Sequence, residues 1–233
     1  MLFRSGNALY RIDAQTGEVT TLVLSEPGRY YWNSFEWSPD GKGLLLAYAD
    51  RDARENRLVR RDLETGQETV LYRSPRSTLS SPYSYFAVSH DGRNIALGGL
   101  AQSTEPARTT AVALLNETRS HVLSAMPAAG GEPHELVQFQ EQGSAARFHR
   151  YDWTADGRYL VYAKGNPQDH KAELWRIAAD GGNPQKLDLV VEGLRALHMH
   201  PDGQRIAFST GKTIGGSELW VMENFLPSLS AKR

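Results

Sequence analysis

Residues 35–47 read FEWSPDGKGLLLA, and this stretch decides the fold because it recurs three times. The echoes are FAVSHDGRNIAL at 86–97, YDWTADGRYLVY at 151–162 and LHMHPDGQRIAF at 197–208. Each copy has an apolar, variable, apolar triplet, then two turn formers, Asp-Gly and a short apolar run. Asp-Gly favours a tight turn, because glycine accepts positive φ and the Asp side chain accepts hydrogen bonds from nearby amides. Each copy therefore predicts a β-hairpin.

A second motif alternates with these hairpins. It reads LYRID at 9–13, LVRRD at 58–62 and LWRIA at 174–178, with a looser copy across 122–137. The run LWVM at 219–222 opens one more copy. Two hairpins in succession make a unit of four strands, which is typical of a propeller blade.

The spacing of the hairpins gives the architecture. The Asp-Gly turns begin at 40, 91, 156 and 202, so they are 51, 65 and 46 residues apart. Dividing the chain by five gives blades of about 47 residues, a length usual for propellers. The sequence therefore predicts one all-β domain, a five-bladed β-propeller of four-stranded antiparallel blades. The expected units are residues 1–25, 30–74, 83–139, 147–189 and 194–226.

The two ends of the chain fit this plan imperfectly. Residues 2–4 read as a second strand, so the first unit lacks an innermost strand, and the last unit lacks an outermost one. The termini then either share a blade or leave two blades incomplete. A four-bladed ring with a redundant strand and a fragment of a larger propeller are the alternatives. The longest spacing predicts an elongated third unit with an additional strand near 110–115.

Composition narrows the function. Lys and Arg total 26 against 27 Asp and Glu, so no basic excess is present to neutralise the phosphates of a nucleic acid. Cysteine is absent, which excludes disulfides, thiolate nucleophiles and thiolate metal sites. No apolar run is long enough to span a membrane, and the first residues hold no signal-peptide stretch. The compartment stays open between periplasm and cytoplasm.

The motif WSPDG at 37–41, with its three echoes, resembles the WD40-like Ser-Pro-Asp-Gly repeat of TolB-like propellers. Similar repeats occur in the propeller domains of prolyl-oligopeptidase-type peptidases and in oligogalacturonate lyases. The resemblance implies a bacterial propeller that binds a protein or peptide, and no cofactor. Residues 218–227 also look like the end of propellers appended to bacterial regulators, so a ligand-sensing domain is an alternative.

An enzyme is the less favoured interpretation. A peptidase of this kind needs a Gly-x-Ser-x-Gly nucleophile turn, and the sequence has none. A carbohydrate-active lyase that uses His and Arg at the ring centre is the remaining enzymatic alternative. His198 and His200 are spaced to share one side of a strand, which makes them weak candidates for a metal site. His200 holds the turn position of Ser38, which favours local hydrogen bonding instead, so no metal is predicted.

The starts of the innermost strands line one mouth of the expected channel, where aromatic, His and Arg side chains converge. Arg can hold a carboxylate with two hydrogen bonds, and aromatic rings give stacking area. We therefore predict that this mouth binds an acidic or peptide-like ligand through Tyr31, Trp32, Tyr83, His149, Arg150 and Arg195. In the alternative, the rings pack between blades and the arginines pair with Glu36 and Asp152. Blade edges left open also predict a homodimer formed by strand addition.

Overall fold

The computed structural model describes residues 2–5, 8–24, 26–75, 85–100, 118–142, 150–165, 171–211 and 217–223. The regular structure of this part consists of β-strands, paired antiparallel in five sheets. The all-β prediction is therefore confirmed. Within the described residues, no helix is long and apolar enough to cross a membrane.

Three sheets have four strands, and the first and last have three. The first sheet holds β1 (Leu2–Ser5), β2 (Ala8–Ile12) and β3 (Val19–Val23). The second holds β4 (Arg29–Trp37), β5 (Gly43–Asp50), β6 (Glu55–Asp62) and β7 (Glu68–Pro75). The third holds β8 (Tyr85–Val88), β9 (Asn94–Leu100), β10 (Thr118–Pro127) and β11 (His134–Gln142). The fourth holds β12 (Tyr151–Trp153), β13 (Tyr159–Gly165), β14 (Lys171–Ala178) and β15 (Gln185–Glu192), and the fifth holds β16 (Leu194–Met199), β17 (Arg205–Gly211) and β18 (Ser217–Glu223).

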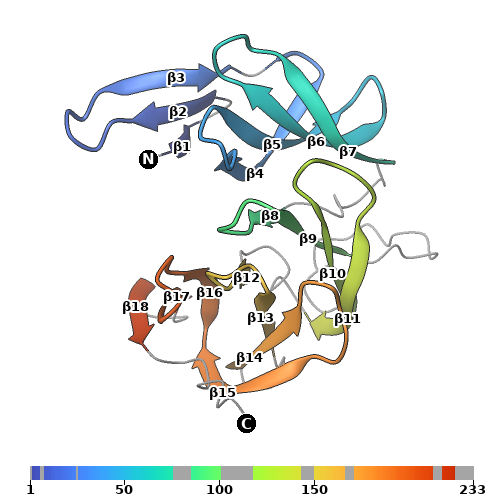
Figure 1. The fold of residues 1–233 in the computed structure, drawn as a ribbon, viewed down its shortest axis with the longest axis vertical. Coiled ribbons are helices and arrows are strands. Elements are labelled where there is room, and N and C mark those ends of the chain that lie inside the picture. Colours follow the sequence, from blue (N-terminus) through green and yellow to red (C-terminus); the bar gives the residue numbers. More distant parts are fainter. Residues whose placement is uncertain are drawn as a thin grey trace.

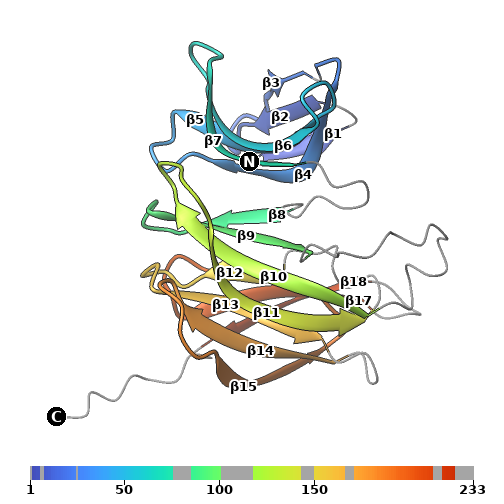
Figure 2. The same ribbon diagram turned by 90° about the vertical axis from the view of Figure 1, so that its right-hand side faces the viewer.

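The sheets follow one another around an arc, with β4, β8, β12 and β16 on its inner side (Figure 1). The first and last sheets face each other across an opening, and Figure 2 shows the intervening sheets stacked face against face. The sequence motifs identify β1 as a second strand and β18 as a third strand. The prediction that both terminal units are incomplete is thus confirmed for the described residues. The strand expected near 110–115 lies outside them.

Hydrophobic cores lie between consecutive sheets. The apolar residues of each inner strand point back onto the preceding sheet: Phe86 packs with Leu45 and Leu58, and Trp153 packs with Ala96 and Leu123. The fifth sheet repeats this against the fourth, where Leu197, Met199 and Ile206 join Val161 and Leu174. This arrangement explains the apolar, variable, apolar triplet. The two outer side chains pack against the preceding sheet, and the central side chain points away from that sheet.

The Asp-Gly turns are built as their chemistry predicts. Each glycine has φ between +66° and +70°, the region that favours glycine: Gly41, Gly92, Gly157 and Gly203. The Asp40 carboxylate accepts hydrogen bonds from the Ser38 hydroxyl and the Lys42 amide, which lower its pKa to about 2. Such Asp carboxylates shape the turn and remain solvated.

Candidate functional site

The central position of the triplet on each inner strand carries Glu36, Ala87, Asp152 and His198. These residues come from four different sheets, and the repeat places them at equivalent points on the inner side of the arc. Glu36 and Asp152 are close enough to interact electrostatically, and Asp152 lies beside His198. We call these four residues the inner wall.

Both inner-wall carboxylates join consecutive sheets. Glu36 Oε2 accepts the Val88 amide hydrogen at 3.1 Å, and Asp152 Oδ2 accepts the Met199 amide hydrogen at 2.9 Å. Val88 and Met199 occupy the same repeat position, directly after the central one. The two bonds are therefore one interaction used twice, in which a carboxylate satisfies the free edge of the next inner strand.

The inner wall perturbs the ionisation of its members. Burial, opposed by the Val88 amide and assisted by the charge of Asp152, raises the pKa of Glu36 to about 8. The His198 Nδ1 lies 3.7 Å from Asp152 Oδ2, and this carboxylate raises the pKa of His198. Of the two inner-wall carboxyl groups, Glu36 is the one whose pKa is raised by burial.

The structure separates the residues predicted at the channel mouth. The Tyr31 ring packs against Tyr48 with centroids 5.3 Å apart, and it joins the core between the first two sheets. Burial raises the pKa of Tyr31. Trp32 lies on β4, but its side chain is outside the described part, as are all of Tyr83 and His149.

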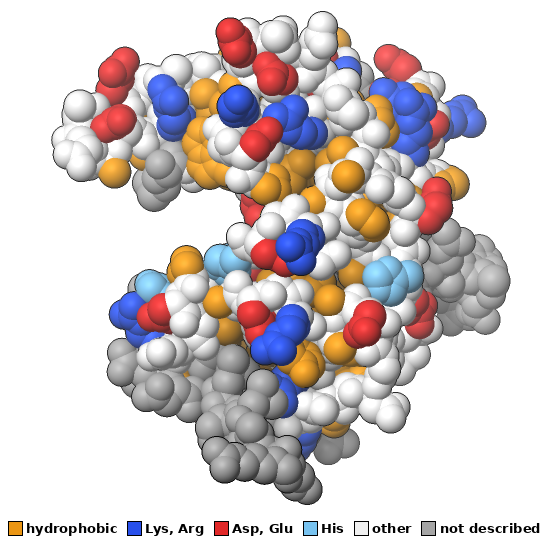
Figure 3. Space-filling view, viewed as in Figure 1, with side chains coloured by type: hydrophobic (Ala, Val, Ile, Leu, Met, Phe, Trp, Pro, Cys, Tyr) orange, Lys and Arg blue, Asp and Glu red, His pale blue; other side chains and the backbone are white. Residues whose placement is uncertain are grey.

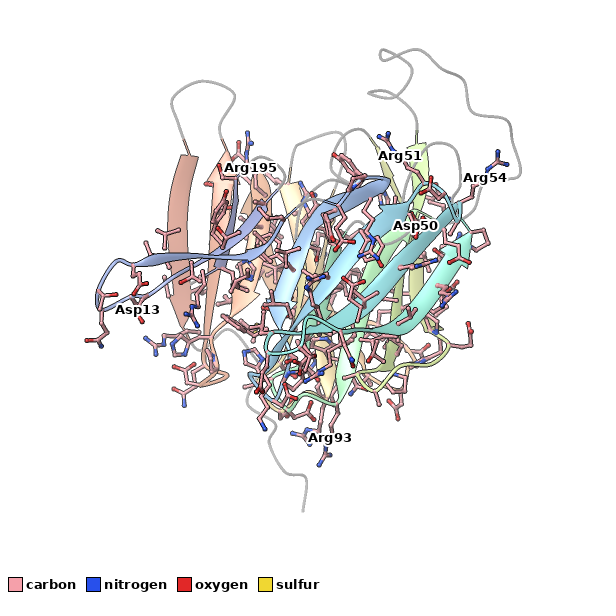
Figure 4. All side chains as sticks on the ribbon, turned by 90° about the horizontal axis from the view of Figure 1, so that it is seen from above. Asp13, Asp50, Arg51, Arg54, Arg93 and Arg195 are labelled. Carbon is pink, nitrogen blue, oxygen red and sulfur yellow. The ribbon has the colours of Figure 1, made fainter. Side chains whose placement is uncertain are left out.

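The two predicted arginines lie near one another. The Arg150 guanidinium donates to the Leu194 carbonyl at 2.6 Å, next to Arg195. The Arg195 side chain is exposed, and Figure 4 places it at the same end of the molecule as Asp50, Arg51 and Arg54, opposite Arg93. Binding of an acidic ligand at this mouth stays a prediction, with Arg195 its most accessible described member.

The weak metal candidates find different partners. His198 faces Asp152, whereas His200 Nδ1 lies 3.0 Å from Asp202 Oδ2 inside its own turn. Arg205 also reaches that Asp202, with its Nη2 at 2.7 Å. Within the residues described, no group of three or more His, Cys, Asp or Glu side chains is arranged to hold a metal ion.

A network of charged side chains surrounds Arg29 at the start of β4, and no sequence motif predicts it. The Glu68 carboxylate contacts Arg29 and Arg61, each at 3.0 Å, and accepts the Tyr48 hydroxyl at 3.0 Å. Glu26 contacts both arginines as well. The paired residues lie up to 39 positions apart in the sequence, so only the folded sheet brings them together.

Trp37 is the most unusual exposed side chain of this region. It holds the repeat position of Val88, Trp153 and Met199, yet 37% of its surface is exposed, while Trp153 is fully buried. Trp153 is covered by β8, and its Nε1 donates to the Ala87 carbonyl at 2.9 Å. Before β4, the described first sheet offers no strand equivalent to β8. Figure 3 shows the molecule hollowed between its first and last sheets.

Comparisons with known proteins place this geometry among β-propellers. No family model and no curated protein matches the chain. Among solved structures, TolB from Acinetobacter baumannii matches with TM-score 0.64 and 13% identity, over 93% of this chain and 46% of that one. An acylaminoacyl peptidase from Pyrococcus horikoshii gives TM-score 0.58 and 14% identity, over 92% of this chain and 33% of that one. An oligogalacturonate lyase in complex with manganese gives 0.55 and 15%, over 93% and 68%.

These likenesses show the fold. The chain is a β-propeller by class. More particularly, it has the fold of the TolB-like propellers, as the repeat predicted. It spans about half the length of the TolB chain that it matches. Because the similar structures include enzymes as well as TolB, the function has to be argued from the residues of this chain.

Proposed function

We propose that this chain is a non-catalytic propeller module that binds a segment of a protein or peptide in the hollow between its first and last sheets. The observation that carries the proposal is the exposure of Trp37, at a repeat position that is buried in Trp153 and Met199 and partly buried in Val88. An exposed tryptophan beside an open strand edge is a typical anchor of protein recognition.

The likeness to TolB is compatible with a binding module but supports the propeller fold alone, because enzymes share that fold. The inner wall adds support. Its two carboxyl groups bond to backbone amides of neighbouring sheets, a role that joins blades and needs no reaction.

Site-specific photo-crosslinking in cells of the source organism tests the proposal. A photoreactive residue at position 37 should capture a defined protein, and the same residue at Val190 should not. Val190 is a matched control, since it is 52% exposed and lies on β15 of a different sheet. The captured protein, once purified, should bind this chain and lose about tenfold in affinity on Trp37→Ala. Equal capture at the two positions, or an affinity unchanged by Trp37→Ala, would refute the proposal.

A second candidate is a carbohydrate-active lyase. The raised pKa of Glu36, near Asp152 on the same inner wall, favours it, because a carboxyl group that keeps its proton to higher pH suits general acid chemistry. Incubation with oligogalacturonate, followed by ultraviolet absorbance of an unsaturated product, decides between the two. Turnover that disappears in Glu36→Gln would replace the binding module by the enzyme.

A further inference from the structure

The complete interfaces between sheets show what kind of segment could cover Trp37, where the described first sheet has no inner strand. Between the third and fourth sheets, Trp153 donates its indole hydrogen to the main-chain carbonyl of Ala87, the central residue of the preceding inner strand. Tyr151, two residues earlier, donates its hydroxyl to the Tyr85 carbonyl at 2.6 Å. Side chains of the next sheet thus hold an inner strand by hydrogen bonds to its main-chain carbonyls. Any extended segment has such carbonyls to offer.

The central residue also has a preferred chemistry. Where it is acidic, as in Glu36 and Asp152, its carboxylate accepts the amide hydrogen of the residue equivalent to Trp37. Where it is Ala87, no carboxylate is available, and the Trp153 amide bonds instead to its own neighbour, Asp152 Oδ1, at 2.8 Å. In the described chain, the main-chain amides of Val88, Trp153 and Met199 at this repeat position therefore all donate a hydrogen bond to a carboxylate.

The Asp-Gly turns give independent evidence that the place in front of Trp37 is unoccupied in the described chain. A Cβ on Gly92 would lie 2.5 Å from Pro39, one on Gly157 would lie 2.9 Å from Asp91, and one on Gly203 would lie 3.1 Å from Ala155. Each of these turns rests on the turn of the preceding sheet. A Cβ on Gly41 would meet nothing within 4 Å. Both Trp37 and Gly41 therefore face the place of a preceding inner strand and its turn.

We infer that the proposed partner presents an extended segment with an apolar, acidic, apolar triplet, which adds as a strand antiparallel to β1 and covers Trp37. Its acidic residue supplies both contacts: the main-chain carbonyl accepts Trp37 Nε1–H, and the carboxylate accepts the Trp37 amide hydrogen. The surface continues the row of established interfaces between the sheets, and it pairs with a strand edge that is open in the described first sheet. The inference rests on the proposed function and names the chemistry of its partner.

Capped synthetic peptides with the triplet Val-Asp-Val or Val-Ala-Val, each flanked by Ser and Thr, test this mode of binding. Isothermal titration of the whole chain should show saturable binding of the acidic peptide, about tenfold weaker for the Ala peptide. The variant Trp37→Ala should abolish binding, and Trp37→Phe should weaken it by about tenfold or less, because the ring remains and the indole hydrogen is lost. Val190→Ala should leave the affinity unchanged. The indole signal of Trp37 in a nitrogen–proton correlation spectrum should shift on binding.

Several outcomes would overturn the inference. Equal affinity for the two peptides, or full binding by Trp37→Ala, would exclude strand addition at Trp37. If acrylamide cannot quench Trp37 in the isolated chain, a segment of the chain itself fills the position. If sedimentation shows a dimer that Trp37→Ala dissociates, the occupant is a second copy. Failure of the peptides while crosslinking at position 37 still captures a protein would leave the proposed function standing without this mode of binding.

Discussion

Two tryptophans at the same repeat position, Trp153 and Trp37, have opposite surroundings. Trp153 is fully buried, and its indole hydrogen is bonded to the strand in front of it. Trp37 is about one-third exposed. A residue at this repeat position therefore acquires its role from the preceding sheet. The same side chain joins blades where that sheet has an inner strand, and it is exposed where the described sheet has none.

The two tryptophans should therefore differ most in what they contribute to stability. Trp153→Ala empties a packed interface and leaves the Ala87 carbonyl without its donor, so it should lower the free energy of unfolding by about 3–5 kcal/mol. Trp37→Ala removes a partly solvated ring and should cost about 1 kcal/mol or less. Urea denaturation followed by circular dichroism measures both.

Phenylalanine variants refine this prediction. Trp153→Phe keeps most of the buried area but loses the hydrogen bond to Ala87, so its cost should fall between wild type and Trp153→Ala. Trp37→Phe should match wild type. A loss of stability at Trp37 as large as that at Trp153 would mean that Trp37 is covered in solution, and the contrast between the two interfaces would disappear.

The two carboxyl joints should differ in their response to pH. The pKa of Glu36 is raised to about 8 in the folded protein, whereas the ordinary pKa of a Glu carboxyl group is 4.5. Between these two pH values, the folded protein therefore keeps a proton on Glu36 that the unfolded chain has released. Folding is therefore most favoured by Glu36 at acid pH, and stability falls as the pH rises from about 4.5 to about 8. Glu36→Gln keeps an uncharged acceptor for the Val88 amide. It should raise stability by about 3–5 kcal/mol at pH 9 and change it little at pH 4.5.

Melting temperatures across this pH range check the prediction. Asp152→Asn is the comparison, because Asp152 makes the equivalent bond to Met199 and carries the charge that His198 faces. It should lower stability near neutral pH, where Glu36→Gln raises it. An unchanged pH profile in Glu36→Gln would show that Glu36 is ionised in the folded protein.

Much of the fold could be predicted from the sequence because its signals are local. Asp-Gly with a polar residue two positions before the Asp favours a turn, and the alternating triplet beside it indicates which side chains are buried. These signals also located β1 as a second strand and β18 as a third strand, from a few residues each. The exact register of bulged strands such as β4 could not be predicted, because it depends on how the sheets pack.

The candidate site was harder to predict, because its contacts join residues from different sheets. The sequence analysis selected aromatic and basic residues at the strand starts and left Glu36 and Asp152 as partners for arginines. Their recorded partners include backbone amides about 50 residues away. The available signal was the variable position of the triplet, which turns away from the preceding sheet and toward the following one. The environment of Trp37 was beyond prediction, since it depends on a neighbour and not on the residue itself.

The smallest expected effect compares two turns, Gly92→Ala and Gly41→Ala. Both glycines have φ near +70°, so each alanine pays about 1 kcal/mol for adopting a left-handed backbone. At Gly92 the new methyl group would also lie 2.5 Å from the Pro39 ring, which cannot swing aside as a flexible side chain does. Overpacking should therefore add about 1 kcal/mol at Gly92 and nothing at Gly41. Equal losses in urea denaturation would mean that the turn before Gly41 is occupied in solution. Two further results together would show that the added segment lies over Gly41 as the preceding turn lies over Gly92. The larger loss of stability in Gly92→Ala should not change when the Val-Asp-Val peptide binds, and Gly41→Ala should weaken the binding of that peptide.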